Sequence, residues 1–269
     1  MLAKFETVNT FVFDMDGTLL NDAHELSALT IRALNDLRAR GFNVVIATGR
    51  HINDIRGYLQ QLGGGIAAIT CNGANIHGRN GELIYREGLP LLVNEMLLPL
   101  GNEFDVHINM YTDTDWLVVK PCESLLEAHE SAQFFYRQIT LDAMLATPAL
   151  KILFYGANAD LQALKVQIYK ANPPDINLTF SDENYLEVMQ HNISKGHALR
   201  ILLDELSLSV DQAMAFGDGM NDVELFRTVA HPVVMENAST TLKQIFPDAH
   251  RALMNHEDGV ARFLYENIL

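Results

Sequence analysis

Short apolar runs alternate with amphipathic stretches in the first part of the chain. The runs 10–13, 44–47 and 66–69 are continuous and apolar, which is typical of strands buried on both faces of a parallel sheet. Between them, apolar residues recur every three or four positions over 26–37 and 52–62, as in helices that bury one face. This alternation predicts an α/β core, with helices covering both faces of a parallel sheet.

The same alternation returns near the C-terminus. We expect a helix over 199–206, a strand over 213–216, a helix at about 222–229 and a strand over 233–235. Because these elements resemble those at the start of the chain, they extend the same sheet. The predicted Rossmann-like core therefore has two parts, 1–81 and 190–269.

Residues 82–189 have a different pattern. Strands are expected over 106–111, 116–119 and 151–155, a hairpin over 177–189, and helices at about 124–139 and 159–171. Alternating polar and apolar positions favour an antiparallel sheet with one covered face. This segment is therefore predicted to be an inserted α+β domain, joined to the core by linkers at 78–81 and 190–192.

The charge balance limits the partners of the chain. Lys and Arg number 19 against 34 Asp and Glu, giving a net charge of −15, which disfavours nucleic acids and anionic membranes. The first apolar run is broken by Asp14 and Asp16, unlike a secretory signal. Cys71 and Cys122 are too few and too far apart for a disulfide framework or a CxxC metal site. We expect a cytoplasmic protein with no nucleic-acid or membrane partner.

Polar residues follow the expected core strands. They are Asp14, Thr48, Asn72, Asp218 and Asn237. In open parallel sheets, ligands bind beyond the carboxyl ends of the strands, so these positions predict a site. The alternative is that such residues only cap the helices that follow. This alternative is weaker for Asp14 and Asp218, because of the residues that surround each of them in the sequence.

The first aspartate begins the motif Asp14-Met15-Asp16-Gly17-Thr18. Two carboxylates this close repel each other unless they share a cation. A carboxylate can attack phosphorus and form an aspartyl phosphate. A second carboxylate can protonate the leaving alcohol and later deprotonate water. The motif is therefore compatible with phosphoryl transfer.

The second aspartate lies in Gly217-Asp218-Gly219-Met220-Asn221-Asp222. Mg²⁺ prefers oxygen ligands, and the carboxylates of Asp14 and Asp218 with the backbone carbonyl of Asp16 could supply them. Asp222 could bind the ion directly or orient a metal-bound water. A glycine-rich turn with a helix cap is the alternative, and it leaves Asp218 without a role.

Two further residues could bind phosphate. Lys195 lies at the start of a predicted helix, and Thr48 begins Thr48-Gly49-Arg50. A lone lysine is more often a surface residue, and a threonine after a strand often caps a helix. Together with Mg²⁺, however, a lysine and a hydroxyl would make the site locally cationic, so that an acidic protein could hold a phosphate.

These motifs, in this order, resemble those of the haloacid dehalogenase superfamily, and specifically its Cof-type phosphatases. Such proteins carry a large cap domain inserted between the second and third motifs. The resemblance covers essentially the whole chain, including the Asn72-Gly73 turn and the ending Asp258-Gly259-Val260-Ala261. It implies a parallel α/β core, a cap that sets substrate specificity, and an Mg²⁺-dependent phosphatase.

The resemblance also implies roles for individual residues. Asp14 would be the nucleophile and Asp16 the general acid and base. The phosphoryl group would be held by Met15, Thr48, Gly49, Lys195 and Asn221. The Mg²⁺ site would comprise Asp14, Asp16, Asp218 and Asp222. Glu236 departs from the pattern, because relatives usually have Gly there, and its negative charge near the mouth of the site bears on substrate fit.

The reaction that we expect is hydrolysis of a small phosphomonoester through an aspartyl phosphate on Asp14. The resemblance offers sugar phosphates, pyridoxal phosphate and pyrophosphorylated vitamin precursors as substrates. Two alternatives stay open: a phosphomutase or phosphotransferase that shares the intermediate, and a phospho-acceptor regulatory protein without turnover. The placement of Asp16, which suits protonation of a leaving group, disfavours the second alternative.

Overall fold

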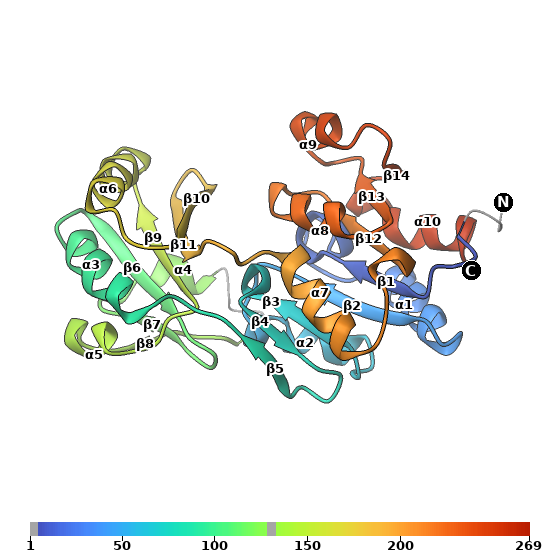
Figure 1. Cartoon of the computed structure of the whole chain (residues 1–269), viewed down its shortest axis with the longest axis horizontal. Helices are drawn as coiled ribbons and strands as arrows, with labels where there is room; N and C mark the ends of the chain where they lie inside the picture. The colour runs from blue at the N-terminus through green and yellow to red at the C-terminus, as the bar shows by residue number, and fades with distance from the viewer. Residues whose placement is uncertain (1–4, 128–132) are drawn as a thin grey trace. The chain divides into compact units, whose positions relative to one another are not determined.

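The computed structural model describes residues 5–127 and 133–269, and the chain divides into two compact units. One unit runs to Tyr85 and resumes over Ser194–Leu269, and the other comprises Arg86–Ile193. The sequence-based limits of the inserted domain, 82 and 189, lie a few residues earlier at each end and remain a prediction. Each unit contains its own sheet (Figure 1).

The first unit is built on an eight-stranded sheet in the order β14-β13-β12-β1-β2-β3-β4-β5. The strands are β1 (Thr10–Phe13), β2 (Asn43–Ala47), β3 (Ala67–Thr70), β4 (Asn75–His77), β5 (Leu83–Arg86), β12 (Ala213–Gly217), β13 (His231–Met235) and β14 (His250–Ala252). The pairs from β14 to β3 are all parallel. This confirms the predicted α/β core.

Helices cover both faces of this sheet. They are α1 (Ala28–Ala39), α2 (Ile52–Gln61), α7 (Lys195–Glu205), α8 (Val223–Thr228), α9 (Thr240–Ile245) and α10 (Gly259–Asn267). Local sequence sets their ends: Ser27 accepts a hydrogen bond from the Thr30 amide, and Ser194 accepts one from the His197 amide.

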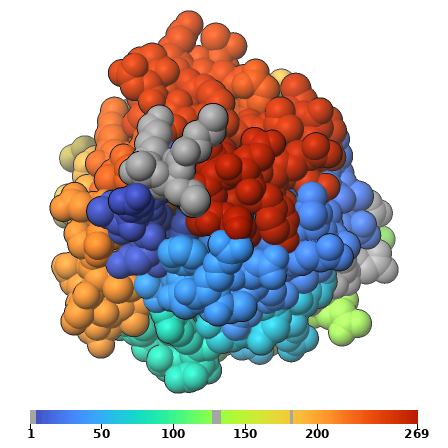
Figure 2. All heavy atoms as spheres, turned by 90° about the vertical axis from the view of Figure 1, so that its right-hand side faces the viewer, coloured from blue at the N-terminus to red at the C-terminus, as the bar shows by residue number. Residues whose placement is uncertain are grey.

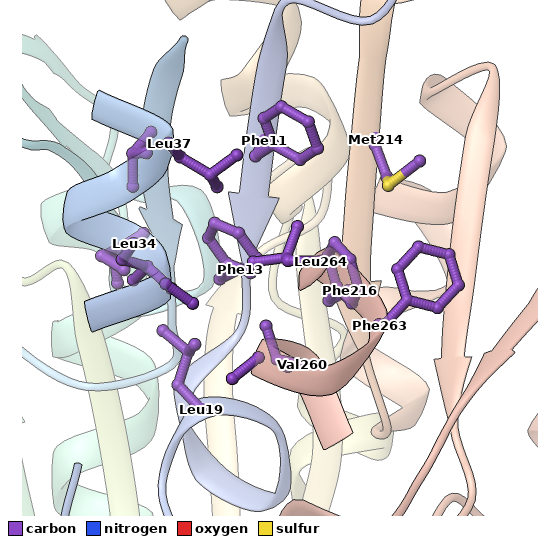
Figure 3. Close-up of a cluster of buried hydrophobic side chains, with 14 of the residues drawn as sticks. Phe11, Phe13, Leu19, Leu34, Leu37, Met214, Phe216, Val260, Phe263 and Leu264 are labelled. Atoms are coloured by element: carbon purple, nitrogen blue, oxygen red, sulfur yellow. The ribbon is translucent and has the colours of Figure 1, made fainter. Parts of the chain in front are cut away.

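The strands bury alternate side chains against the two helical layers. Phe11 and Phe13 of β1 and Phe216 of β12 pack with Leu34 of α1 and Leu264 of α10, as Figure 3 shows. The intervening residues of these strands face the other layer, which contains α7, α8 and α9. Burial on both faces explains why the strands are continuous apolar runs instead of alternating ones.

The C-terminal helix packs against the N-terminal part of the chain. Helix α10 contacts α1, and Figure 2 shows the red C-terminal segment against the blue segment. The Tyr265 hydroxyl donates to the Asp36 carboxylate across this contact. Two distant parts of the chain therefore close one layer over the sheet.

One predicted linker belongs to the sheet. Residues 78–81 connect β4 to its neighbour β5, and the Gly78 amide donates to the Glu82 carbonyl. The prediction of a linker at 78–81 is therefore wrong, because this glycine-containing segment is the turn of a hairpin that extends the sheet.

The second unit has a six-stranded sheet in the order β10-β11-β9-β6-β7-β8. Its strands are β6 (Val106–Tyr111), β7 (Trp116–Val118), β8 (Arg137–Gln138), β9 (Lys151–Gly156), β10 (Ile176–Asp182) and β11 (Tyr185–Gln190). Its helices are α3 (Leu91–Asn102), α4 (Glu123–Glu127), α5 (Leu141–Leu145) and α6 (Asn158–Ala171). Apart from the parallel pair β7–β8, the neighbouring strands of this sheet are antiparallel.

The helix expected over 124–139 is only partly present. Helix α4 is described over Glu123–Glu127, residues 128–132 lie outside the described residues, and Arg137–Gln138 pair with β7 as a strand. Phe134 and Tyr136 pack their rings on Trp116, and the Tyr136 hydroxyl accepts a hydrogen bond from the Cys122 amide. Tertiary aromatic packing has overridden helix propensity here.

Over residues 5–127 and 133–269, every helix is too short or too polar to span a bilayer.

Candidate active site

The predicted site residues of the first unit lie at the carboxyl edge of its sheet. Asp14 follows β1, Thr48 follows β2, Asp218 follows β12 and Asn237 lies just beyond β13. Lys195 is the first residue of α7. Because these strands are parallel, their ends converge on one edge, where the helix N-terminus also lies.

Lys195 joins two aspartates in the interior. Its Nζ donates to Asp14 Oδ1 at 2.6 Å and to Asp222 Oδ1 at 2.8 Å. The Lys195 and Asp222 side chains are fully buried, and that of Asp14 is 7% exposed. A buried ammonium requires such partners, so the surface position considered for Lys195 does not apply.

Asp222 organises the loop that follows β12. Its Oδ2 accepts hydrogen bonds from the Asp218 amide at 3.1 Å and the Gly219 amide at 3.0 Å, while Oδ1 bonds to Lys195. The side chain makes no bond that caps the helix after it. Both oxygens of Asp222 therefore accept hydrogen bonds that fix Lys195 and the turn carrying Asp218.

Asp218 is held by side chains from two other loops. Thr18 Oγ1 donates to Asp218 Oδ1 at 3.0 Å, and Asn237 Nδ2 lies 3.4 Å from Oδ2. Gly17, the residue before Thr18 in the same loop, has a φ of +73°, and a Cβ there would collide with the Asp218 carboxylate. Glycine is therefore required at position 17 for both its backbone conformation and the close approach of Asp218.

Three carboxylates meet in this cluster. One oxygen of each of Asp14, Asp218 and Asp222 lies within 4.8 Å of the others. Burial raises the pKa of Asp14 well above its usual value, and the charges of Asp222 and Asp218 add to this effect against the opposing charge of Lys195. Burial and the Asp222 charge raise the pKa of Asp218 to about 6. Such crowding of negative charge is what a bound cation relieves.

Asp16 has different surroundings. Arg50 Nε donates to Asp16 Oδ2 at 2.8 Å and Nη2 donates to Oδ1 at 2.6 Å. Burial acts to raise the pKa of Asp16, but the hydrogen bonds and charge of Arg50, together with His24, outweigh burial and lower it. Asp14 and Asp16 are thus two carboxylates with opposite pKa shifts, an arrangement typical of divided catalytic roles.

The remaining predicted phosphate contacts lie in the loops that follow β1, β2 and β12. The Thr48 side chain is fully buried, and its oxygen accepts a hydrogen bond from the Arg50 amide at 3.1 Å. Asn221 is exposed and its Nδ2 donates to Asn72 Oδ1 at 3.0 Å. The Met15 side chain packs in the core, so only its backbone can contribute to a phosphate site; Gly49 likewise offers only backbone groups.

The structure adds residues that the sequence analysis did not assign. Arg50 enters the sequence analysis only as the last residue of Thr48-Gly49-Arg50. The signal that could have identified it is its positive charge after a strand, close to other strand ends that carry aspartates. Asn237, predicted only as a polar residue after a strand, has a defined partner: its Nδ2 donates to the Gly17 carbonyl at 2.7 Å as well as approaching Asp218. Thr18 was noted only as the last residue of its motif. No local sequence pattern distinguishes Thr18 from a residue that only caps a helix.

Comparison with known proteins assigns this chain to a family. The family model of haloacid dehalogenase-like hydrolases matches residues 11–264. The chain is a haloacid dehalogenase-like hydrolase. This confirms the resemblance based on the four motifs.

Curated relatives of this hydrolase are phosphatases. It is 37% identical over 254 residues to the HMP-PP phosphatase of Enterobacter sp. (strain 638), with 94% of this chain and 93% of that protein covered. The hydrolase is therefore an enzyme, a phosphatase of this family.

Solved structures agree with the fold. A Thermotoga maritima protein has a TM-score of 0.87 and 26% sequence identity, with 97% of this chain and 98% of that chain covered. A haloacid dehalogenase-like hydrolase from Bacteroides thetaiotaomicron has a TM-score of 0.88 and 24% identity, covering 96% and 99%. Both comparisons extend over the core and the inserted unit.

Proposed function

We propose that this hydrolase releases phosphate from small phosphomonoesters through an aspartyl phosphate on Asp14. The observation that supports this most directly is the buried Lys195 ammonium, 2.6 Å from Asp14 Oδ1. A fixed positive charge beside a strand-end carboxylate can stabilise a phosphoryl group in transfer. It also explains how a chain with a net charge of −15 binds an anionic substrate.

In the first half-reaction, a carboxylate oxygen of Asp14 attacks phosphorus. The bond from phosphorus to the ester oxygen breaks, and its electron pair goes to that oxygen. Asp16 gives a proton to the same oxygen, so the alcohol leaves as a neutral molecule. The products of this half-reaction are the aspartyl phosphate, the ionised Asp16 and the alcohol.

In the second half-reaction, water attacks the phosphorus of the aspartyl phosphate. Asp16, now a carboxylate, accepts a proton from this water, and the bond from phosphorus to the Asp14 oxygen breaks. Inorganic phosphate leaves, and both aspartates return to their initial states. Arg50, which favours the ionised form of Asp16, supports its action as a base in this half-reaction.

Neutral and cationic donors would hold the phosphoryl oxygens in both half-reactions. We assign this role to the Lys195 ammonium, the Thr48 hydroxyl, the Asn221 amide and the backbone amides of Met15 and Gly49. Thr48 and Lys195 are buried, so water does not weaken the electrostatic interaction of their donor groups with a phosphoryl oxygen. Asn221 is exposed and can reach a ligand at the edge of the site.

The donor set of the acidic cluster fits Mg²⁺. The carboxylates of Asp14 and Asp218 offer hard oxygen ligands, and the Asp16 backbone carbonyl is the third that we assign. Asp222 belongs to the same cluster, but both of its oxygens accept hydrogen bonds, so we assign it the role of orienting its neighbours. When bound, Mg²⁺ supplies positive charge that stabilises the phosphoryl group during transfer.

The relatives suggest which substrate to test first. Enterobacter sp. (strain 638) and Escherichia coli (strain 55989 / EAEC) have relatives named HMP-PP phosphatase, so we propose HMP-PP as the first candidate for this enzyme. With a pyrophosphorylated substrate, the leaving group that accepts the proton from Asp16 is a phosphate oxygen in place of an alcohol. Sugar phosphates and pyridoxal phosphate are the other classes that we expect. A cytoplasmic location and the lack of a nucleic-acid or membrane partner remain predictions from the sequence.

The deciding experiment is phosphate release from HMP-PP, hexose phosphates, pyridoxal phosphate and p-nitrophenyl phosphate, with Mg²⁺ and with EDTA. We expect release that needs Mg²⁺ and that falls by at least about a thousandfold in Asp14→Asn. Asp248→Asn, at an exposed position, is the matched control. Parental activity in Asp14→Asn would refute the mechanism. Transfer of phosphate to a second substrate, or a phosphoenzyme that persists for hours, would instead indicate one of the two alternative functions.

A further inference from the structure

Arg50 binds one side of Asp16, the residue proposed above as general acid and base. The two N–H···O bonds, at 2.8 and 2.6 Å, come from adjacent nitrogens of one guanidinium group and reach both carboxylate oxygens. This planar fork fixes the orientation of a carboxylate as well as its position. The Asp16 side chain remains 45% exposed while that of Arg50 is 18% exposed, so a leaving group can still reach the carboxylate.

Arg50 is itself held by the first turns of α2. Asp54 Oδ2 lies 3.8 Å from Arg50 Nη1, and the Arg50 guanidinium carbon lies 5.7 Å from the centre of the Tyr58 ring. The Asp54 side chain is only 6% exposed, so the surrounding packing holds its carboxylate in place beside Arg50. The guanidinium therefore has an anion and an aromatic ring to hold it, in addition to Asp16.

The contacts return to Asp16 through a second route. The Tyr58 hydroxyl donates to the His24 carbonyl at 2.8 Å, and His24 Nδ1 lies 3.4 Å from Asp16 Oδ1. His24 has a φ of +56°, a left-handed conformation that non-glycine residues seldom adopt. Residues from three loops and one helix thus form a closed ring around one carboxylate.

Stability alone does not require such a ring. A half-exposed ion pair contributes little to the free energy of folding, yet here one is supported by an anion, a ring and a strained backbone. An acid and base that acts in both half-reactions must present the same oxygen to two different partners, and misplacement by about 1 Å is enough to reduce the rate strongly. Orientation is what a bidentate arginine provides.

We propose that Arg50 is the positioning residue of Asp16, and that Tyr58 and Asp54 position Arg50. This inference rests on the proposed function, because it assumes that Asp16 protonates the leaving group. It assigns to the last residue of Thr48-Gly49-Arg50 a role that does not involve contact with the phosphoryl group.

Leaving-group dependence tests this role. kcat/KM covers only the steps up to alcohol release, so it depends on Asp16 for an alkyl phosphate with a basic leaving oxygen but much less for p-nitrophenyl phosphate. General acid catalysis contributes about 10²- to 10⁴-fold. We therefore expect Arg50→Gln to lower kcat/KM for the alkyl ester by about 10- to 100-fold, and by less than about threefold for p-nitrophenyl phosphate.

Two further variants guard against a merely structural effect. Arg50→Lys keeps the charge without the fork, and we expect it to recover part of the loss for the alkyl ester. Arg56→Gln, at an exposed arginine of α2, should match the parent with both esters. Equal losses with both esters in Arg50→Gln would overturn the inference, because they would indicate contact with the phosphoryl group. Parental values with both esters would also overturn it.

If Arg50→Gln does not fold, Tyr58→Leu tests the same ring with Arg50 intact, and its expected loss is likewise confined to the alkyl ester. Asp14→Asn and Asp16→Asn separate this inference from the proposed function. Turnover in Asp14→Asn, or an absence of leaving-group dependence in Asp16→Asn, would refute the proposed function. An alkyl-specific loss in Asp16→Asn without one in Arg50→Gln or Tyr58→Leu would refute the inference alone.

Discussion

Lys195 Nζ lies 2.6 Å from Asp14 Oδ1, although 181 positions separate the two residues in the chain. Close packing of α7 makes this possible. Gly196, the next residue, has no room for a side chain because a Cβ there would meet the Glu224 carbonyl, and a Cβ at Gly73 would meet the Ser194 carbonyl. Two glycines therefore let the first turn of α7 approach the sheet edge and deliver the ammonium to the nucleophile.

Replacing Lys195 by Met should destabilise the fold as well as stop turnover. The substitution leaves two buried carboxylates, Asp14 and Asp222, without their cation. Removing one partner of a buried ion pair costs about 3–5 kcal/mol. Urea unfolding of Lys195→Met against Lys170→Met, an exposed control, measures this difference.

The loss in Lys195→Met should persist up to pH 9, because Lys195 stays charged in the folded parent. Although burial acts to lower the pKa of Lys195, the charges of Asp14 and Asp222 raise it overall. A raised lysine pKa gives stability that is complete below the unfolded value of about 10.4 and is lost only as the pH rises through the folded value. Stability equal to that of the control would refute the proposed importance of this ion pair.

Asp218→Asn should make the metal-free enzyme more stable at pH 8. With a folded pKa of about 6, Asp218 is ionised there in both the folded and unfolded states, and the folded state bears the cost of burial and of repulsion by Asp222. Asparagine keeps an oxygen for Thr18 and removes that cost, so we expect a gain of about 1–3 kcal/mol.

The gain from Asp218→Asn should shrink as the pH falls from about 6 to 4. In this range the folded parent binds a proton at Asp218 before the unfolded chain does, so the parent becomes relatively more stable. Unfolding in EDTA at pH 8, 6 and 4 gives the three differences. A gain that is constant over this range would contradict the raised pKa of Asp218.

Mg²⁺ should change the difference in stability between the parent and Asp218→Asn. If Asp14 and Asp218 hold the ion, Mg²⁺ should raise the melting temperature of the parent at pH 8 and raise it less at pH 5, where a proton competes with the ion for Asp218. Asp218→Asn should lose most of the increase. An equal increase in parent and variant would place the ion elsewhere.

Asn237→Ala should weaken Mg²⁺ binding without removing a ligand. Its Nδ2 donates to the Gly17 carbonyl and approaches Asp218, and its Oδ1 accepts from the Asn255 amide at 3.1 Å. Residues that orient metal ligands typically contribute about 10- to 100-fold in metal affinity. Titration of activity with Mg²⁺ should show such an increase in the metal required, with near-parental kcat at saturation. Parental metal dependence would assign Asn237 a purely structural role.

The sheet and its polar edge could be predicted from the sequence because both depend on local patterns. Continuous apolar runs marked β1, β2 and β12, and in a parallel sheet the residues that follow such strands must share one edge. The pattern of the sequence therefore places Asp14, Thr48 and Asp218 at this edge. Lys195 could be predicted only from its motif, because a single lysine after Ser194 does not show in the periodic pattern of apolar residues.

The contacts between loops could not be predicted in this way. Arg50 reaches Asp16 across 34 positions, and the choice between that partner and solvent depends on where α2 packs. Phe134 and Tyr136 likewise form no helix because Trp116 provides a packing surface for their rings. Such outcomes depend on tertiary distances, which a periodic pattern does not encode.

Glu236 should matter only when its partner is removed. The structure pairs it with Lys243, whose Nζ donates to Glu236 Oε1 at 3.0 Å. The extra charge beside Asn237 is therefore neutralised locally. Lys243→Ala should expose this charge and raise KM for a phosphorylated substrate severalfold at low salt, with less effect as salt screens the charge. The double variant Lys243→Ala, Glu236→Gly should return KM to the parental value. If KM in Lys243→Ala stays parental at low salt, Glu236 lies too far from the bound phosphate to influence it, and its departure from the family pattern has no bearing on substrate fit.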